Sequence, residues 1–236
     1  MAYILITGNK GYIGSGLPGD GIDLKEGQDI LTYKATRKYD VVIHTAALTS
    51  VTESEACPKA YLRTNVQGTK NMLLQHPEAH FIYLSTAGVY GEGKGHTVRS
   101  PIDPLSYYAK TKFEGELLVR EYADSWTILR LTNVIGDGER GEPNVYQVFQ
   151  ASDVLPIYGD GLQTRDFIHM DRVREIIMAA AIKRKRGLFN VGSGLSKTVL
   201  EVAQEFNKPI KFFPARPGEI KHFGVKDALN NITQLR

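Results

Sequence analysis

Cysteine is almost absent from this chain, because Cys57 is the single one among 236 residues. One thiol cannot build a disulfide framework or a cysteine zinc site, so those two classes of small stabilised domain are excluded. We interpret Cys57 as a buried or idle thiol. The N-terminus leads directly into an apolar segment at residues 3–7 without the pattern of a signal peptide. These features favour a reducing, cytoplasmic setting.

Long hydrophobic runs and an excess of one charge are also lacking. No apolar run approaches the roughly 18 residues that a membrane crossing requires. The net charge is +3, from 29 basic and 26 acidic residues. The one basic run, residues 183–186, closes an apolar stretch before Gly187, where cations complement a helix dipole. We therefore expect no nucleic-acid partner and no membrane partner.

Short apolar segments, rich in β-branched residues and bounded by polar or glycine-rich turns, recur along the first half of the chain. They predict strands of a parallel sheet buried on both faces, at residues 4–6, 41–44, 81–84 and 127–131. Between them, residues 60–74 and 108–122 have helical spacing of apolar side chains. Alternating strands and helices predict an α/β fold, a Rossmann-like doubly wound parallel sheet.

The texture of the sequence changes after Asn133, where turn-rich stretches at residues 136–143 and 159–161 appear. We predict a dinucleotide-binding domain at residues 1–133 and a smaller part at 134–236 that caps the ligand edge of the sheet. A helix at 171–186, with Asp171 near its N-cap, could pack back on the first domain.

Tyr108 and Lys112 form a Tyr-x-x-x-Lys pair, and Thr86 stands 22 residues upstream of the tyrosine. A phenol is a poor base, with an ordinary pKa of about 10. An ammonium one helical turn along favours the phenolate, and Thr86 can hydrogen-bond the same substrate oxygen. Tyr108 can then take a proton as hydride leaves the neighbouring carbon. This group predicts a nicotinamide-dependent enzyme acting on a carbinol or ketone.

A glycine loop, TGNKGYIG, follows the first predicted strand and carries Gly8, Gly11 and Gly14. Glycine lets backbone N–H groups approach a pyrophosphate closely, and a following helix N-terminus supplies partial positive charge. The loop therefore predicts a dinucleotide site. Its spacing is G-x-x-G-x-x-G rather than the more familiar G-x-G-x-x-G.

The segment after the loop is unusually short, because Asp23 lies only nine positions after Gly14 and the stretch between them is rich in glycine and proline. Either Asp23 is the ribose-binding acid after a collapsed connection, or the first crossover and second strand are missing. In the second case Asp23 and Leu24 would contact adenine, and the 21 residues from Asp23 to His44 favour this case. NAD is the expected cofactor, with NADP left open because Lys10 could attract a 2′-phosphate.

Further motifs follow these in a familiar order: HTAALTSV, NVQGT, LSTAGVYG, LRLTNVIG, YGDGLQTRDFIHMDRV, FNVGSG and ARPGE. With them the chain resembles, nearly end to end, the extended short-chain dehydrogenases, specifically the nucleotide-sugar epimerase/dehydratase family. The resemblance implies a nucleotide-sugar substrate and a homodimer paired through the helices at 60–74 and 108–122. Two departures are the short segment after the glycine loop and a C-terminus that stops early.

The resemblance also implies roles for individual residues. The loop glycines with Tyr12 and Ile13 would hold the pyrophosphate, and Lys10 belongs to the same loop. The dinucleotide would further be lined or supported by Asp23, Leu24, Ala46, Ala47, Thr49 and Asn65, with Lys112 anchoring its ribose. The sugar nucleotide would be bound by Thr86, Asn133, Arg165, Arg216 and Glu219. No metal is implied.

The residues that follow Thr86 bear on the reaction. The family's 4,6-dehydratases carry an acid pair there, whereas Ala87 and Gly88 stand at these positions. We therefore expect an NAD-dependent isomerase, an epimerase that inverts C4 of a UDP-hexose through a transient 4-keto sugar. The alternatives are an NADPH-dependent nucleotide-sugar reductase, supported by Lys10, and a non-catalytic sensor, suggested by the two truncations.

Overall fold

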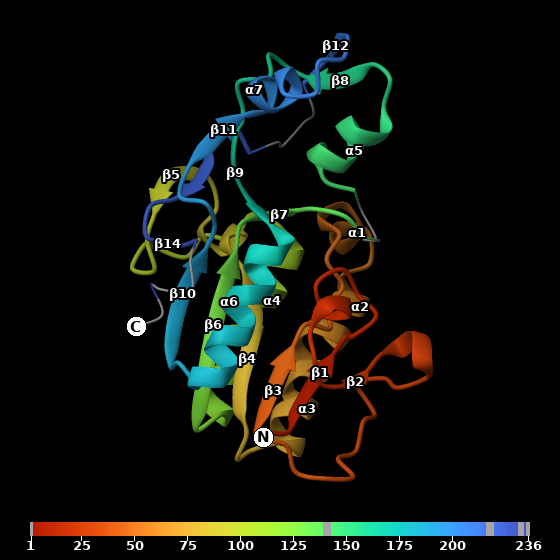
Figure 1. The fold of residues 1–236 in the computed structure, drawn as a ribbon, viewed down its shortest axis with the longest axis vertical. Coiled ribbons are helices and arrows are strands. Elements are labelled where there is room, and N and C mark those ends of the chain that lie inside the picture. Colours follow the sequence, from red (N-terminus) through yellow and green to blue (C-terminus); the bar gives the residue numbers. More distant parts are fainter. Residues whose placement is uncertain (1, 139–142, 216–219, 231–233, 235–236) are drawn as a thin grey trace.

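Seven parallel strands form the central sheet of the computed structural model, which describes residues 2–138, 143–215, 220–230 and 234. The strand order is β14-β10-β6-β4-β3-β1-β2 (Figure 1). The strands are β1 (Ile4–Thr7), β2 (Asp20–Ile22), β3 (Val41–His44), β4 (His80–Thr86), β6 (Ser125–Leu131), β10 (Gly187–Val191) and β14 (Ala228–Leu229). The predicted α/β fold class is confirmed, and the four predicted strands are β1, β3, β4 and β6.

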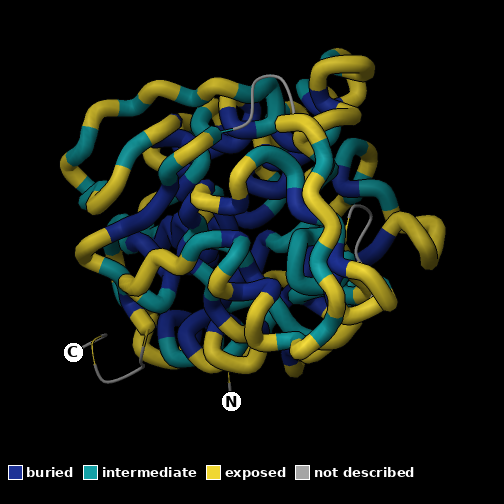
Figure 2. The backbone as a smooth tube through the Cα atoms, turned by 90° about the horizontal axis from the view of Figure 1, so that it is seen from above, coloured by how far each residue is buried: buried dark blue, intermediate teal, exposed yellow. Residues whose placement is uncertain are grey.

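Helices cover both faces of this sheet (Figure 1). On one face lie α1 (Val51–Ala56), α2 (Pro58–Tyr61), α3 (Thr69–Gln75) and α4 (Tyr107–Tyr122), and on the other lies α6 (Met170–Lys183). Successive side chains of a strand point to opposite faces. Accordingly Leu5 packs with the core beneath α3 and α4, whereas Ile6 packs with the core beneath α6. Buried stretches of the backbone gather toward the centre of the molecule, and exposed stretches lie around them (Figure 2).

The segment at 60–74, predicted as one continuous helix, is divided into three pieces. A π-helical turn, η3 (Leu62–Gly68), separates α2 from α3. Such turns insert an extra residue and often occur at functional sites. Here the turn carries Asn65, whose side chain is fully buried.

The connection between β1 and β2 contains only a single 3₁₀ turn, η1 (Gly14–Gly16), in place of a crossover helix. The second strand is nevertheless present, because β2 pairs in parallel with β1 and Thr7 lies opposite Ile22. The expectation that the second strand is missing is therefore wrong. Spacing misled because β2 has only three residues and follows the glycine-rich turn directly. A 3₁₀ turn, η2 (Leu24–Glu26), comes next.

The smaller elements stand beyond the carboxyl ends of the strands (Figure 1). They comprise the three-stranded sheet of β7 (Asn133–Ile135), β9 (Thr164–His169) and β11 (Ser196–Thr198), the pair β8 (Leu155–Tyr158) and β12 (Ile210–Phe213), the pair β5 (Gly93–His96) and β13 (Phe223–Val225), and the helices η4 (Ala87–Tyr90), α5 (Val145–Ala151) and α7 (Val199–Gln204). Strand β10 belongs to the seven-stranded sheet and α6 packs against that sheet, although both come after residue 133 in the chain. The predicted domain boundary at residue 133 therefore stays a prediction. No helix within the described part of the chain combines the length and apolarity that a membrane crossing requires.

Candidate active site

A cavity of about 1040 Å³ opens at the carboxyl ends of the central strands. Ligands of doubly wound folds bind at this edge. Most of the residues singled out from the sequence line it: Gly8, Lys10, Gly11, Tyr12, Ile13, Asp23, Leu24, Ala46, Ala47, Thr49, Thr86, Tyr108 and Asn133. The fold therefore brings most of the predicted dinucleotide residues into one cavity with Thr86, Tyr108 and Asn133.

The glycine loop is held tightly against the first two strands. Gly8 adopts a φ of +70°, a left-handed conformation that favours glycine, and its N–H donates to the carbonyl of Ile22 at 2.8 Å. A Cβ at Gly14 would overlap the carbonyl of Gly8. Gly8 and Gly14 therefore permit a tightly folded backbone that side chains at these positions would disrupt.

Asp23 immediately follows β2, with its carboxylate fixed by backbone donors. Its two oxygens accept from the N–H groups of Lys25 and Lys10 at 2.8 and 3.0 Å. Because β2 is present, Asp23 occupies the place where a dinucleotide fold carries its ribose-binding acid. Beside it, the Lys10 ammonium is paired with Glu26 at 2.9 Å. The two carboxylates make this end of the cavity unfavourable for an additional phosphate.

Thr86 and Tyr108 reach the cavity from two adjoining elements. Thr86 ends β4, where its hydroxyl accepts from the N–H of Gly88 at 3.1 Å. Tyr108 lies in the first turn of α4, a helix capped by Ser106, and its N–H donates to the Ser54 hydroxyl at 3.0 Å. The Thr86 hydroxyl and the Tyr108 backbone are thus both fixed in place, and both residues line the cavity.

Lys112 lies one helical turn after Tyr108 and is buried, although it does not line the cavity. Its ammonium stands 4.2 Å from the centroid of the Tyr83 ring. Burial lowers the pKa of Lys112 to about 7, and the nearby Glu116 carboxylate partly opposes that shift. A lysine with this pKa gains or loses its proton near neutral pH. The burial of Lys112 therefore sets how much positive charge lies one helical turn from Tyr108.

Asn65 lies beneath the site and connects its elements instead of lining the cavity. Its side-chain amide both accepts from the N–H of Leu48 at 2.9 Å and donates to the carbonyl of Leu48 at 3.0 Å. It also donates to the Thr111 hydroxyl on α4 at 3.1 Å. Asn65 thus ties the segment after β3, which carries Ala46 and Ala47, to the helix that carries Tyr108.

A buried ion pair under Thr86 was not foreseen from the sequence. The Arg130 guanidinium donates to the Glu116 carboxylate at 2.8 and 2.6 Å, and the Ser85 hydroxyl donates to the same carboxylate at 2.6 Å. Removing one member of such a buried pair leaves an uncompensated charge and is strongly destabilising. The pair joins α4, β4 and β6 directly behind Thr86. Because Glu116 and Arg130 come from different elements, local spacing in the sequence gave no signal of the pair.

The predicted sugar residues are only partly united. Asn133 lines the cavity, and its amide donates to the carbonyl of Asp166 at 3.2 Å. Arg165, on β9, is not among the residues that line the cavity and donates to the carbonyl of Thr164 at 2.8 Å. Arg216 and Glu219 lie outside the described residues.

The two residues after Thr86 carry no acidic side chain, and their surroundings in the structure are close-packed. Ala87 is fully buried, and a Cβ built on Gly88 would lie 3.2 Å from the Thr86 hydroxyl. Among the described residues that line the cavity, the carboxylates are Asp23 and Asp29, which follow β2 at the glycine-loop end.

Residues 18–192 match the NAD dependent epimerase/dehydratase family. The chain belongs to this family. NAD is the cofactor of this family, and the glycine loop together with Asp23 fits it. The match begins after the glycine loop, in keeping with the shortened connection between β1 and β2.

The names of similar curated proteins describe two different reactions, dehydration and epimerisation. The chain is 33% identical over 189 residues to dTDP-D-glucose 4,6-dehydratase of Bos taurus, covering 75% of this chain and 53% of that protein. It is 31% identical over 239 residues to UDP-glucose 4-epimerase 3 of Oryza sativa subsp. japonica, covering 84% of this chain and 64% of that protein. The chain thus spans about half the length of the first relative.

Solved structures of similar fold include complexes with NAD. MoeE5 in complex with UDP-glucose and NAD has a TM-score of 0.81 at 28% identity, covering 94% of this chain and 89% of that one. UDP-glucose 4-epimerase of Thermus thermophilus in complex with NAD has a TM-score of 0.83 at 24% identity, covering 99% and 91%. The second likeness shows the extended short-chain dehydrogenase fold.

Proposed function

We propose that this protein is an NAD-dependent nucleotide-sugar epimerase that inverts C4 of a UDP-hexose. The observation that carries the proposal is the pair Ala87 and Gly88 beside the Thr86 hydroxyl. Elimination of water from a keto sugar needs an acid and a base at that point. Within the described residues the carboxylates of the cavity stand at its other end, which favours epimerisation over dehydration.

The chain's own residues supply the proton transfers. NAD⁺ held by the glycine loop and Asp23 would supply the hydride acceptor, and then the hydride donor, at C4 of the sugar. Tyr108 takes the proton of the C4 hydroxyl as the hydride leaves, and the Thr86 hydroxyl hydrogen-bonds the same oxygen. After the keto sugar turns over in the cavity, Tyr108 returns the proton as hydride arrives on the other face. Atoms and electrons balance without net redox.

The charge behind Tyr108 supports this role. Lys112 is on the same face of α4, one turn along, and its positive form favours the phenolate. We assign Asn133, Arg165, Arg216 and Glu219 to the nucleotide sugar, since guanidinium groups match a diphosphate. Substrate binding by these four residues is part of the proposal.

NAD is favoured over NADP by the electrostatics around Asp23. The NADPH-reductase alternative rested on Lys10, and the pairing of Lys10 with Glu26 at 2.9 Å weakens that support. A homodimer is proposed from the exposed apolar side chains Leu74 on α3 and Leu117 on α4, which are 55% and 49% exposed.

The test is incubation of the purified protein with UDP-galactose and a catalytic amount of NAD⁺. We expect UDP-glucose to form with no lasting absorbance from reduced cofactor. A parallel incubation with dTDP-glucose should yield no 4-keto-6-deoxy sugar. Formation of that keto sugar would contradict the epimerase proposal in favour of dehydration, and product only with stoichiometric NADPH would favour the reductase.

A further inference from the structure

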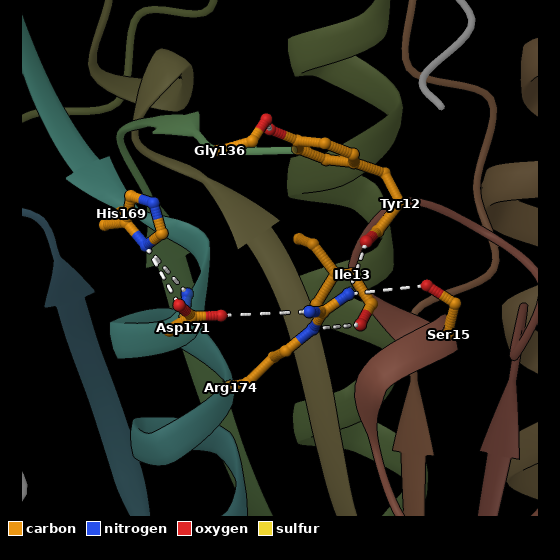
Figure 3. Close-up of polar contacts among 7 residues, drawn as sticks. All are labelled: Tyr12, Ile13, Ser15, Gly136, His169, Asp171 and Arg174. Atoms are coloured by element: carbon orange, nitrogen blue, oxygen red, sulfur yellow. Dashed lines mark hydrogen bonds and ion pairs between the residues drawn. The ribbon is translucent and has the colours of Figure 1, made fainter. Parts of the chain in front are cut away.

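The backbone carbonyls of the glycine loop are bound by a side chain from far along the chain. Arg174, on α6, donates from Nε to the carbonyl of Ile13 at 3.1 Å and from Nη2 to the carbonyl of Tyr12 at 3.0 Å. Its Nη2 also donates to the Ser15 hydroxyl at 3.3 Å. Figure 3 shows the guanidinium extending from α6 to the loop.

These two carbonyls are the ones that a continuing helix would satisfy. In an α-helix each carbonyl accepts from the N–H four residues on, so those of Tyr12 and Ile13 would pair with Gly16 and Leu17. In this chain the helix is reduced to η1, and Leu17 donates to the carbonyl of Gly14 instead, at 3.1 Å. Arg174 therefore supplies the donors that the missing turn would have supplied.

It also supplies positive charge. A glycine loop normally draws on the dipole of the helix behind it to attract phosphate, and a turn of three residues has little dipole to offer. The N–H and C=O of a trans peptide point in opposite directions. A cation bound to the carbonyls of Tyr12 and Ile13 thus polarises the peptide groups whose N–H atoms belong to Ile13 and Gly14, on the side away from α6.

We propose that Arg174 is a positioning residue that replaces the missing helix behind the pyrophosphate-binding loop. The inference rests on the proposed role of the glycine loop in holding NAD. Through Arg174 the loop keeps both its shape and the positive potential that a diphosphate requires.

Two neighbouring contacts fit this role. A Cβ at Gly16 would overlap the Arg174 guanidinium, so glycine at 16 makes room for it. On the other side of the loop, the Tyr12 hydroxyl donates to the carbonyl of Gly136 at 2.9 Å (Figure 3). Asp171 stands 4.0 Å from Arg174 and is 74% exposed, so water screens most of its opposing charge.

The experiment compares ligands with and without a diphosphate. The Kd values of NAD⁺ and ADP are measured by calorimetry, and that of adenosine by ligand-observed NMR, which reaches weak affinities. For Arg174→Ala we expect NAD⁺ and ADP to bind about ten- to hundredfold more weakly, the range for lost charged hydrogen bonds. Adenosine should bind within about twofold of the wild type, because it has no phosphate. Arg174→Lys keeps the positive charge but not the two parallel donors of the guanidinium, so its affinity for NAD⁺ and ADP should fall less than that of Arg174→Ala.

Arg172→Ala is the matched control. Arg172 lies on the same helix and pairs with Glu175 at 2.6 Å, away from the loop. It removes the same charge and should leave all three affinities unchanged. Gly16→Ala, which forces the guanidinium off the loop while keeping it in the chain, should reproduce the selective loss. Thermal melting without ligand identifies any variant that fails to fold.

Several outcomes would overturn the inference. Unchanged ADP binding in Arg174→Ala or in Gly16→Ala would remove it, and so would an equal loss for ADP and adenosine, which would indicate general damage. The variant Gly11→Val distinguishes failure of the role of Arg174 from failure of the proposal that the glycine loop binds NAD. If Gly11→Val loses NAD⁺ while Arg174→Ala does not, only the role of Arg174 fails; if folded Gly11→Val binds NAD⁺ normally, the glycine loop is not the site.

Discussion

The ammonium of Lys112 lies 4.2 Å from the centroid of the Tyr83 ring, inside the protein rather than in the cavity. The Tyr83 hydroxyl donates to the backbone carbonyl of Lys112 at 3.3 Å, so strand β4 and helix α4 are joined twice at this point. A Cβ at Gly115 would overlap the same hydroxyl, which explains a glycine within α4. The burial that results gives Lys112 its lowered pKa.

Stability should depend on pH through Lys112. Its pKa falls from 10.5 to about 7 on folding, so between those values the unfolded chain holds the extra proton. The free energy of unfolding then rises with pH across this window, by up to about 1.4 kcal/mol per pH unit from this group. In the cofactor-free protein, Lys112→Met should remove that slope in denaturant titrations between about pH 7 and the ordinary lysine pKa of about 10.

Lys110, exposed on the same helix, offers a control. Lys110→Met should keep the wild-type slope. An identical slope in Lys112→Met and wild type would contradict the lowered pKa.

Tyr108→Phe should separate chemistry from binding. The phenol is the proposed acid and base, and losing such a group costs about a hundredfold or more in turnover. The Kd of NAD⁺ should stay close to that of the wild type, since the ring is retained. Steady-state turnover together with calorimetry checks both parts, and near-normal turnover would disprove the assignment.

Asp23→Asn should weaken selection of NAD. Removing the carboxylate deletes charged hydrogen bonds to a ribose, so we expect about tenfold weaker NAD⁺ binding and a narrower preference over NADP⁺. Asp20→Asn is the matched control, because Asp20 is an exposed carboxylate at the opposite end of the same strand. Equal effects of the two substitutions on the ratio of Kd values would argue against a specific role for Asp23.

Leu117→Glu should disrupt the proposed homodimer. A charge placed on the exposed apolar face of α4 cannot be buried against a second copy without a large desolvation cost. Sedimentation velocity should show a dimer for the wild type and a monomer for the variant. Leu195→Glu, at another exposed leucine, should remain dimeric. A monomeric wild-type protein would reject the proposal.

The sequence reveals the strands of this fold unevenly. Strands β1, β3, β4 and β6 are buried on both faces, so their apolar runs could be recognised directly. Strand β2 could not, because Asp20-Gly21-Ile22 contains one strongly apolar residue and no alternation. The helical spacing at 60–74 was correct in kind, but the π-helical turn at Asn65 is invisible to a helical period of about 3.6.

Residues of the candidate site could be proposed from the sequence where they lie in short motifs. Thr86, Tyr108, Gly8 and Gly11 were chosen from local spacing, and all four line the cavity. Arg174 could not be proposed in this way, because its contact with Ile13 spans 161 positions and it resembles an ordinary surface arginine in sequence. Supporting contacts of this kind depend on the tertiary fold alone.

The place of α6 in the molecule has a consequence for biosynthesis. This helix covers Ile6, Ile43 and Ile82, which belong to strands made long before residues 170–183. While the chain leaves the ribosome, that face of the nascent sheet stays open to water until the helix follows, at translation rates of about 5–20 residues per second. Contacts so distant in sequence also slow folding, so the exposed interval is one in which chaperones could bind the sheet.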